Sequence, residues 1–278
     1  TIDYRNFIGE FAFEHASRSQ IKKISNDLKL QLKILAETKI VPHLKERSKT
    51  LLTNCQIDIT LSEDGEKLRY FYPTLVNTPI GYLRDHVLIE FGIRNSSEPC
   101  DQHVIAPLLA EVLDGFVLPK PVVTTLSPVR TFWEKVTLIH VECNKKRLTQ
   151  SPARLSRHWY DLHMLTHSWV MDEAFIQRRV LEDVVLHKKA FFNSASAHYD
   201  QCLNGNLRLI PDDADKKVLA TDYRQMKEAG MFPVKPPEFV EIMNSLHELE
   251  LRCNKNRCQA HYGTGKGQIC VLSSTPHP

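Results

Sequence analysis

The stretches SPVRTFWEKVTLIH (127–140) and RLSRHWYDL (154–162) decide the fold of this chain, because they predict two consecutive helices. Each helix has the same start signal, Ser127-Pro128 for the first and Ser151-Pro152 for the second. Serine caps helix N-termini, and proline is favoured at the first helical position. From this point the pattern is almost entirely helical, with helices predicted at 128–143, 153–167, 172–192, 213–229 and 235–253.

The segment that joins the first two helices is strongly basic. Residues 143–160 hold five Lys or Arg and no Asp or Glu. Such a segment can neutralise phosphate, while the neighbouring His158, Trp159 and Tyr160 offer flat faces for stacking on a base. The same composition is also typical of a solvated loop, and the segment alone does not decide between the two.

Lys135 and Asp161 are the leading candidates for chemistry on these helices. Lys135 lies off the apolar stripe that begins at Phe132, and Asp161 lies on the same side of its helix as Arg157. One interpretation is a lysine that contacts phosphate beside an acid. The alternative is a solvated lysine and a surface Arg157–Asp161 pair, which stabilises a helix by a few tenths of a kcal/mol.

The pattern before residue 127 is mixed. Residues 18–48 predict a helix that Pro42 breaks or kinks. Segments 56–61 and 68–72 alternate around an Asp64-Gly65 turn and predict a β-hairpin. Further strands are predicted at 87–94, 103–105 and 122–126.

These elements predict an α+β protein with a domain boundary near residue 127. We expect a sheet-containing domain at 1–127, a helical domain at 128–255 and a flexible tail at 256–278. The chain of 278 residues has a net charge of +3, too small to identify a nucleic-acid binder. No apolar run is long enough to predict a membrane span, and seven scattered cysteines favour a reducing, cytoplasmic setting.

Glu90 interrupts the apolar strand predicted at 87–94. A carboxylate there is costly unless it lies on an open face, is paired, or binds a metal. Arg94, four residues along the same strand face, can pair with Glu90 or reach a phosphate.

Several blocks together resemble the nucleotidyltransferase-like AbiEii/AbiGii toxins, the toxin halves of type IV toxin–antitoxin systems. The resemblance covers roughly residues 50 to 250, and it depends on the order of its blocks: IEFGIR (89–94), SPVRTFWEKVTLIH (127–140), RHWYDLHML (157–165), HKKAFF (187–192) and LIPDDADKKVLATDYRQM (209–226).

The resemblance implies a polymerase-β-like nucleotidyltransferase sheet, here partial, followed by a helical C-terminal domain. It implies transfer of a nucleotide from an NTP, with Mg²⁺, to an acceptor such as tRNA, and a cognate antitoxin as partner. The family pattern places Lys135, Asp161 and Glu90 in the active site, with Glu90 as metal ligand. We add candidate phosphate-binding arginines, which are Arg94, Arg130, Arg154 and Arg157.

The family pattern also includes an upstream GG[ST] element followed by D-x-D, whose aspartates hold the metals. The sequence contains no such element; its Gly263-Thr264 pair has no acid pair after it. We therefore expect that the chain begins just after this motif and is inactive alone. Two alternatives are a non-catalytic remnant and a helical interaction or RNA-binding module that uses the basic linker.

Overall fold

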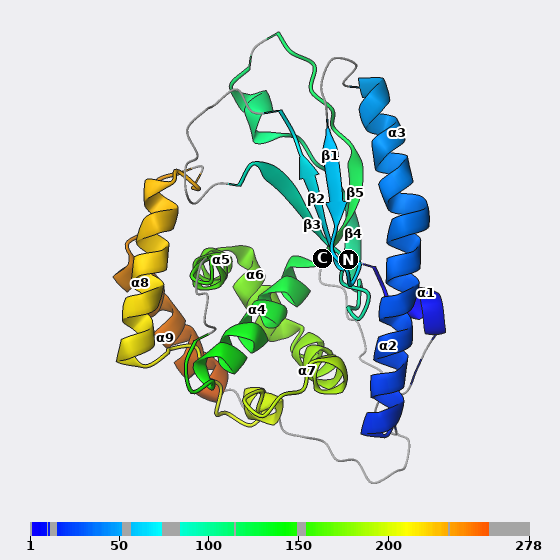
Figure 1. Cartoon of the computed structure of the whole chain (residues 1–278). Helices are drawn as coiled ribbons and strands as arrows, with labels where there is room; N and C mark the ends of the chain where they lie inside the picture. The colour runs from blue at the N-terminus through cyan, green and yellow to red at the C-terminus, as the bar shows by residue number, and fades with distance from the viewer. Residues whose placement is uncertain are drawn as a thin grey trace, which may run out of the picture.

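The computed structural model describes residues 2–9, 11, 16–51, 57–73, 84–113, 115–148, 154–232 and 234–255. Figure 1 shows a helical bundle on one side, two small sheets above it and a long helical column along the other side. The mixture of helices and small antiparallel sheets confirms the α+β prediction. The expected tail at 256–278 lies outside the described residues.

The helical column is built by the N-terminal third of the chain. After the short helix α1 (Arg5–Ile8), it consists of α2 (Arg18–Leu35), the π-helical turn η2 (Ala36–Ile40) and α3 (Val41–Leu51). Proline cannot donate a backbone hydrogen bond, and the π-helical turn lies immediately before Pro42. The column therefore continues through the proline without ending there.

The column packs on two different partners. Leu28 and Leu32 of α2 are buried in a cluster with Tyr4 of the N-terminus, Ile93 of the segment after β3 and Phe191 of α7. Farther along, α3 contacts the first strand of the sheet. The hydroxyl groups of Ser48 and Tyr70 are 2.9 Å apart there.

The strands form two separate antiparallel sheets. The first has the order β1 (Asp58–Leu61), β2 (Lys67–Phe71), β3 (His86–Glu90), so the predicted hairpin is confirmed. The strand predicted at 87–94 ends at Glu90, which lies opposite Lys67. The second sheet pairs β4 (Cys100–Val104) with β5 (Val122–Leu126), and the 3-10 helix η3 (Leu108–Glu111) lies in the connection between them.

The helical part follows β5 without a break. Its elements are α4 (Pro128–Cys143), α5 (Arg157–Thr166), α6 (Trp169–Ile176), α7 (Arg179–Phe191), the 3-10 helix η4 (Tyr199–Cys202), α8 (Asp213–Glu228) and α9 (Phe239–Lys255). The first predicted helix, 128–143, is confirmed with both ends. None of the helices in the described ranges is long and apolar enough to cross a membrane.

Three predicted helices in this part differ from the structure, and the mildest case is the helix predicted at 235–253, which is α9 and begins at Phe239. The predicted single helix 172–192 is wrong, because α6 ends before Gln177 and α7 begins at Arg179. No Gly or Pro marks this break in the sequence, and Ser168 caps α6 earlier than the pattern suggests. Helix α5 begins at Arg157 rather than 153, and the predicted Ser151-Pro152 start lies outside the described residues.

Helix α4 is the centre of the bundle. The predicted stripe of Phe132, Val136 and Ile139 is fully buried, as is Trp133 beside it. Helix α4 packs against α5, α6 and α7. This burial on three sides fixes the direction in which the remaining side chains of α4 project.

Candidate functional site

Lys135 of α4 and Asp161 of α5 meet where the two helices pack. The Lys135 Nζ donates to Asp161 Oδ2 at 2.8 Å. The lysine side chain is 22% exposed and the aspartate side chain 40%, so the pair lies at the edge of the core and is open to solvent. Asp161 therefore pairs with Lys135, not with Arg157 as in the surface-pair alternative.

His158 is the third member of this cluster. Its Nδ1 lies 3.0 Å from Lys135 Nζ, and an ammonium group has only donors, so Nδ1 accepts this hydrogen bond. Burial, and then the positive charges of Lys135, Arg157 and Lys188, lower the pKa of His158 to about 3. The ring is therefore neutral at physiological pH, with its proton on Nε2.

The turn before α5 is held by a buried carboxylate from α8. Asp222 Oδ1 accepts from the backbone N–H of Arg154 at 2.7 Å, and Oδ2 accepts from the backbone N–H of Ser156 at 2.9 Å. The Ser156 hydroxyl donates to Oδ2 as well, at 2.5 Å. Arg154 has a positive φ of 66°, uncommon for a non-glycine residue, and Asp222 holds it there. This anchor fixes where α5 begins and so where His158 and Asp161 point.

Trp159 adds a second anchor for α5. Its ring is fully buried, and its Nε1–H donates to the backbone carbonyl of Leu209 at 3.0 Å. Of the three rings predicted as base-stacking faces, Trp159 is thus part of the core.

The four candidate arginines lie in different environments. Arg157 is exposed at the start of α5, beside His158. Arg130 is 1% exposed and forms ion pairs with Asp183 and Glu134. Arg94 packs over the Phe192 ring and lies 3.7 Å from Glu66. Of these, Arg157 is the one that the structure brings next to Lys135 and Asp161.

Glu90 lies on the sheet. Its side chain is 55% exposed, and its Oε1 is 3.5 Å from the Lys67 Nζ on the neighbouring strand. Among the described residues, no hydrogen bond or ion pair joins Glu90 to Lys135 or Asp161. The described ranges also contain no group of three or more His, Cys, Asp or Glu that could hold a metal ion.

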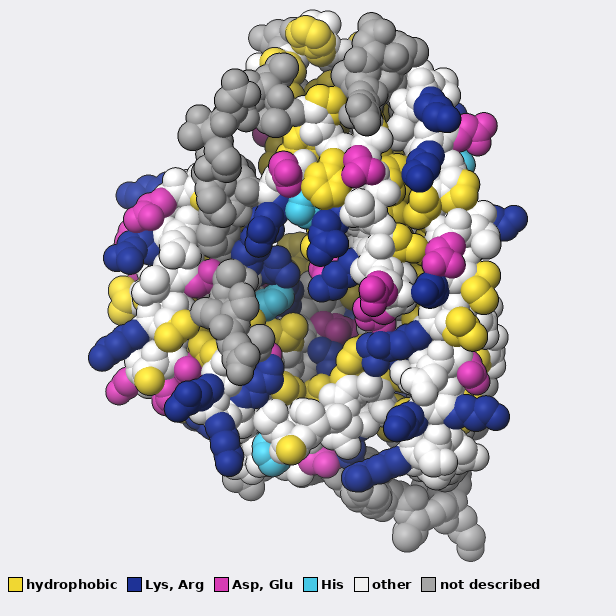
Figure 2. Space-filling view, in the orientation of Figure 1, with side chains coloured by type: hydrophobic (Ala, Val, Ile, Leu, Met, Phe, Trp, Pro, Cys, Tyr) yellow, Lys and Arg dark blue, Asp and Glu magenta, His cyan; other side chains and the backbone are white. Residues whose placement is uncertain are grey.

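The face that contains α5 is hollowed. Figure 2 shows a hollow between α5 and the strands, with Lys and Arg side chains gathered around it. We refer to Lys135, His158 and Asp161 together as the Lys135 site. The family resemblance, not the sequence pattern, selected the lysine and the aspartate of this site. His158 was considered only as a stacking face and not as a partner of Lys135, although its position three residues before Asp161 placed it on the same helix face.

The comparisons with known proteins give one family. The family model described as "Nucleotidyl transferase AbiEii toxin, Type IV TA system" matches residues 11–245. This range contains the sheets and helices α2 to α8, and it includes every residue of the Lys135 site. No curated protein and no solved structure gives a significant match.

Proposed function

We propose a nucleotidyl-transfer reaction for this chain from the premise that it belongs to the nucleotidyl transferase AbiEii toxin family of type IV toxin–antitoxin systems. The proposed reaction moves a nucleotide from an NTP to an acceptor RNA, for which we propose tRNA. Membership of a toxin–antitoxin family also suggests a cognate antitoxin as partner. The geometry of the Lys135 site is the observation that supports this proposal.

The Lys135 ammonium is the proposed contact to the NTP phosphates. An ammonium has three N–H donors, and Lys135 uses one for Asp161 and one for His158. The third donor has no partner among the described residues and is available to a phosphate oxygen. Nucleotidyl transfer requires cations that compensate the charge of the phosphates, and a lysine at the edge of the core provides one.

The two acceptors of Lys135 have different proposed roles. Asp161 forms an ion pair with the Lys135 ammonium and so holds the ammonium in one position at the entrance of the site. His158 holds the same ammonium as a neutral acceptor, so it adds no negative charge that would compete with phosphate. Its Nε2–H has no partner among the described residues and is a second donor for the substrate.

Nucleotidyltransferases of this kind generally use a divalent metal, and Mg²⁺ is the ion that the resemblance implies. The residues described here do not fit such a centre: Glu90 pairs with Lys67, and no three ligating side chains converge. We therefore derive no step through the metal and assign the described residues to nucleotide binding and orientation. We also propose a polymerase-β-like arrangement of the sheet, in which Glu90 is the active-site carboxylate that the sheet contributes.

The test is nucleotide binding, because it does not depend on turnover. Labelled NTPs are titrated into the chain by equilibrium dialysis, and we expect Lys135→Ala to weaken binding by at least tenfold, about 1.4 kcal/mol. The matched control is Lys216→Ala, since Lys216 forms an exposed helical pair with Asp213 at 3.2 Å. Equal affinities for the two variants would overturn the assignment of Lys135.

Transfer itself is tested with labelled NTPs and total tRNA. The missing GG[ST]…D-x-D element predicts no labelling by this chain alone. In a preparation that does label RNA, we expect Asp161→Asn to reduce labelling by at least tenfold without changing the far-UV circular dichroism spectrum. Label that still appears on RNA with the Lys135→Ala variant would contradict the proposed site. Binding of NTP without any labelling would retain the nucleotide site and reject the transfer reaction for this chain.

An RNA-binding module without chemistry is the second candidate, and the exposed Lys146 and Arg147 after α4 favour it. This candidate predicts that replacing both residues by Gln weakens RNA binding and reduces its salt dependence by about two units of slope. It also predicts no effect of Lys135→Ala on NTP affinity. The first candidate thus predicts that Lys135→Ala weakens NTP binding, whereas the second predicts that replacing Lys146 and Arg147 weakens RNA binding.

A further inference from the structure

A second cavity lies beside the start of α4 and along α7. Its volume is about 720 Å³, within the range of roughly 300–1,000 Å³ that is usual for small-molecule sites. It lies where the N-terminal segment, the stretch before β4, the start of α4 and helix α7 meet. Its lining does not include Lys135, His158 or Asp161, so it is separate from the Lys135 site.

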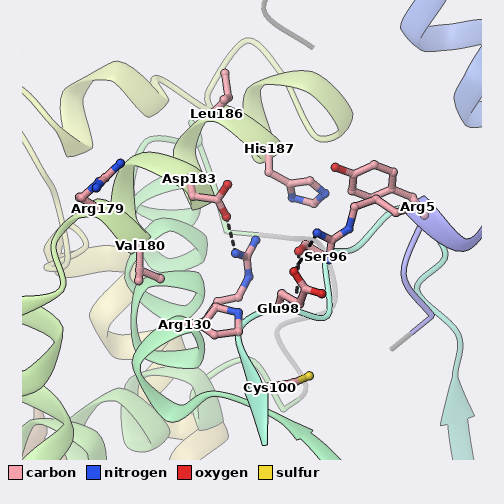
Figure 3. A pocket seen from close by; sticks show the side chains of 12 residues that line it. Arg5, Ser96, Glu98, Cys100, Arg130, Arg179, Val180, Asp183, Leu186 and His187 are labelled. Atoms are coloured by element: carbon pink, nitrogen blue, oxygen red, sulfur yellow. Dashed lines mark hydrogen bonds and ion pairs between the residues drawn. The ribbon is translucent and has the colours of Figure 1, made fainter. Parts of the chain in front are cut away.

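Three arginines and two carboxylates line this cavity: Arg5, Arg130, Arg179, Glu98 and Asp183. Carboxylates outside the lining also pair with two of the arginines, Asp3 with Arg5 and Glu134 with Arg130. Arg5 Nη1 donates to Glu98 Oε2 at 2.9 Å, and Arg130 Nη1 donates to Asp183. Figure 3 shows these two pairs with their side chains extending into the space. Arg179 differs from the other two, because it has no carboxylate within ion-pair distance among the described residues and can pair with an anionic ligand.

Three buried polar atoms of the lining residues lack hydrogen-bond partners, and one of them, Arg130 Nε, is 3.4 Å from a Glu134 carboxylate oxygen. Arg130 Nη2 is a donor without an acceptor, although the side chain is 1% exposed. His187 donates from Nε2 to the Arg94 carbonyl at 2.7 Å, which leaves its Nδ1 as an unpartnered acceptor. Burial lowers the pKa of His187, so Nδ1 carries a lone pair at physiological pH. Leaving such groups buried and unpaired costs about 1–3 kcal/mol each.

We propose that this cavity binds a small hydroxylated phosphate monoester. Guanidinium groups bind phosphate through paired N–H donors, and Arg130 and Arg179 supply them from two neighbouring helices. The ligand hydroxyl donates to His187 Nδ1. Asp183, whose side chain is 60% exposed, competes with the phosphate for the Arg130 guanidinium, and the bound phosphate displaces it. This site does not depend on the nucleotidyl-transfer proposal.

The test uses glycerol 3-phosphate as probe, titrated into the full chain by isothermal calorimetry. We expect Arg179→Gln to weaken binding at least fivefold, and Asp183→Asn to strengthen it by a similar factor because the competing charge is lost. Propyl phosphate, which has no hydroxyl, should bind at least threefold more weakly than the probe. Arg130 is buried and its replacement would test folding as well as binding, so Arg179 and Asp183 are the informative positions.

Two control variants separate this site from others. Arg224→Gln changes an exposed arginine on α8 that pairs with Glu228, and we expect unchanged affinity for the probe. Lys135→Ala should also leave probe binding unchanged, whereas it weakens NTP binding if the proposed function holds. Probe binding that resists both Arg179→Gln and Asp183→Asn, or that falls with Lys135→Ala, would overturn the proposal. Absence of binding at about 10 mM probe would overturn it as well.

Discussion

The helical part around α4 and the β4–β5 hairpin differ in the burial of their apolar side chains. Helix α4 buries most of its aromatic and aliphatic residues, and α5 and α7 each bury an apolar face against it, with Met164 and Leu186 as the exposed exceptions. Between Val104 and Val123, by contrast, ten large apolar side chains are exposed. Figure 1 shows this hairpin and η3 extending away from the bundle. Because burial of apolar surface is the main contribution that favours folding, we infer that the bundle contributes most of the stability. The bundle is also the part that contains the Lys135 site.

The largest expected change in stability from a single substitution comes from removing a buried tryptophan of the bundle. We expect Trp159→Ala to lower the free energy of unfolding by about 3–5 kcal/mol, because it leaves a cavity and removes the hydrogen bond to Leu209. The matched control is Trp169→Ala on α6, whose ring is largely exposed. Urea titrations followed by circular dichroism compare the two. A similar loss in both variants would remove the distinction between core and surface.

The second effect concerns the anchor of α5. Asp222→Ala leaves two backbone N–H groups without their acceptor, and we expect a loss of about 3 kcal/mol because hydrogen bonds to a charged group are among the stronger ones. Asp172→Ala is the control, since Asp172 forms an exposed pair with Arg252. The Asp222 variant should also weaken NTP binding, because the start of α5 positions His158. Unchanged NTP affinity would show that the anchor does not position the site.

A third effect is the response of the bundle to acid. Burial lowers the pKa of His140 to about 4 and of His158 to about 3. The unfolded chain, with ordinary histidine pKa values near 6.5, binds more protons between these limits, so stability is lost as the pH falls below about 6.5. Shifts of this size correspond to about 3 kcal/mol for each group between pH 7 and pH 4; because His158 is only half-buried, its share is smaller, and we expect a total decrease of about 3–6 kcal/mol.

Denaturant titrations across this pH range measure that decrease. His158→Gln should flatten the slope, because the variant has no imidazole to protonate. The control is His103→Gln on the exposed strand β4, for which we expect the slope of the unaltered chain. An identical slope for all three proteins would contradict the assignment of His158 as a buried neutral ring.

The smallest effect belongs to the hairpin. We expect Val112→Ser combined with Phe116→Ser to change the free energy of unfolding by less than about 0.5 kcal/mol, because both side chains are exposed. The same variant should reduce the fluorescence of the hydrophobic dye ANS bound to the native protein. Val136→Ser in α4 is the counterpart, for which we expect a loss of several kcal/mol. A large loss from the hairpin variant would show that these side chains pack in solution.

The local patterns of the sequence were sufficient for much of the fold. Ser127-Pro128 marked the start of α4, and the alternation around Asp64-Gly65 marked the β1–β2 hairpin, because both signals act within a few residues. The break at Gln177 between α6 and α7 has no comparable signal. It depends on how the two helices pack against α4, and that packing has no local pattern.

The candidate site was predictable in part, for the same reason. The resemblance identified Lys135 and Asp161, and the structure brings them within 2.8 Å. His158 was missed because its role depends on an ammonium from another helix. Arg130 illustrates the same limit: its residue type suggests phosphate binding, but tertiary packing alone places it beside Asp183 and Glu134 in the second cavity and not at the Lys135 site. Charge type is visible in a sequence, whereas the partner of a charge is not.

The π-helical turn at Ala36–Ile40 has a consequence for how the two halves of the molecule are connected. Such a turn adds a residue to a helix, and each residue rotates the following face by about 100°. It therefore sets the phase between the face of α2 that holds Leu28 and Leu32 against the bundle and the face of α3 that holds Ser48 against Tyr70. Because of this one extra residue, the same continuous helical column can contact the cluster around Phe191 with one face and Tyr70 of the sheet with another, although the two partners lie at different angles around the helix axis.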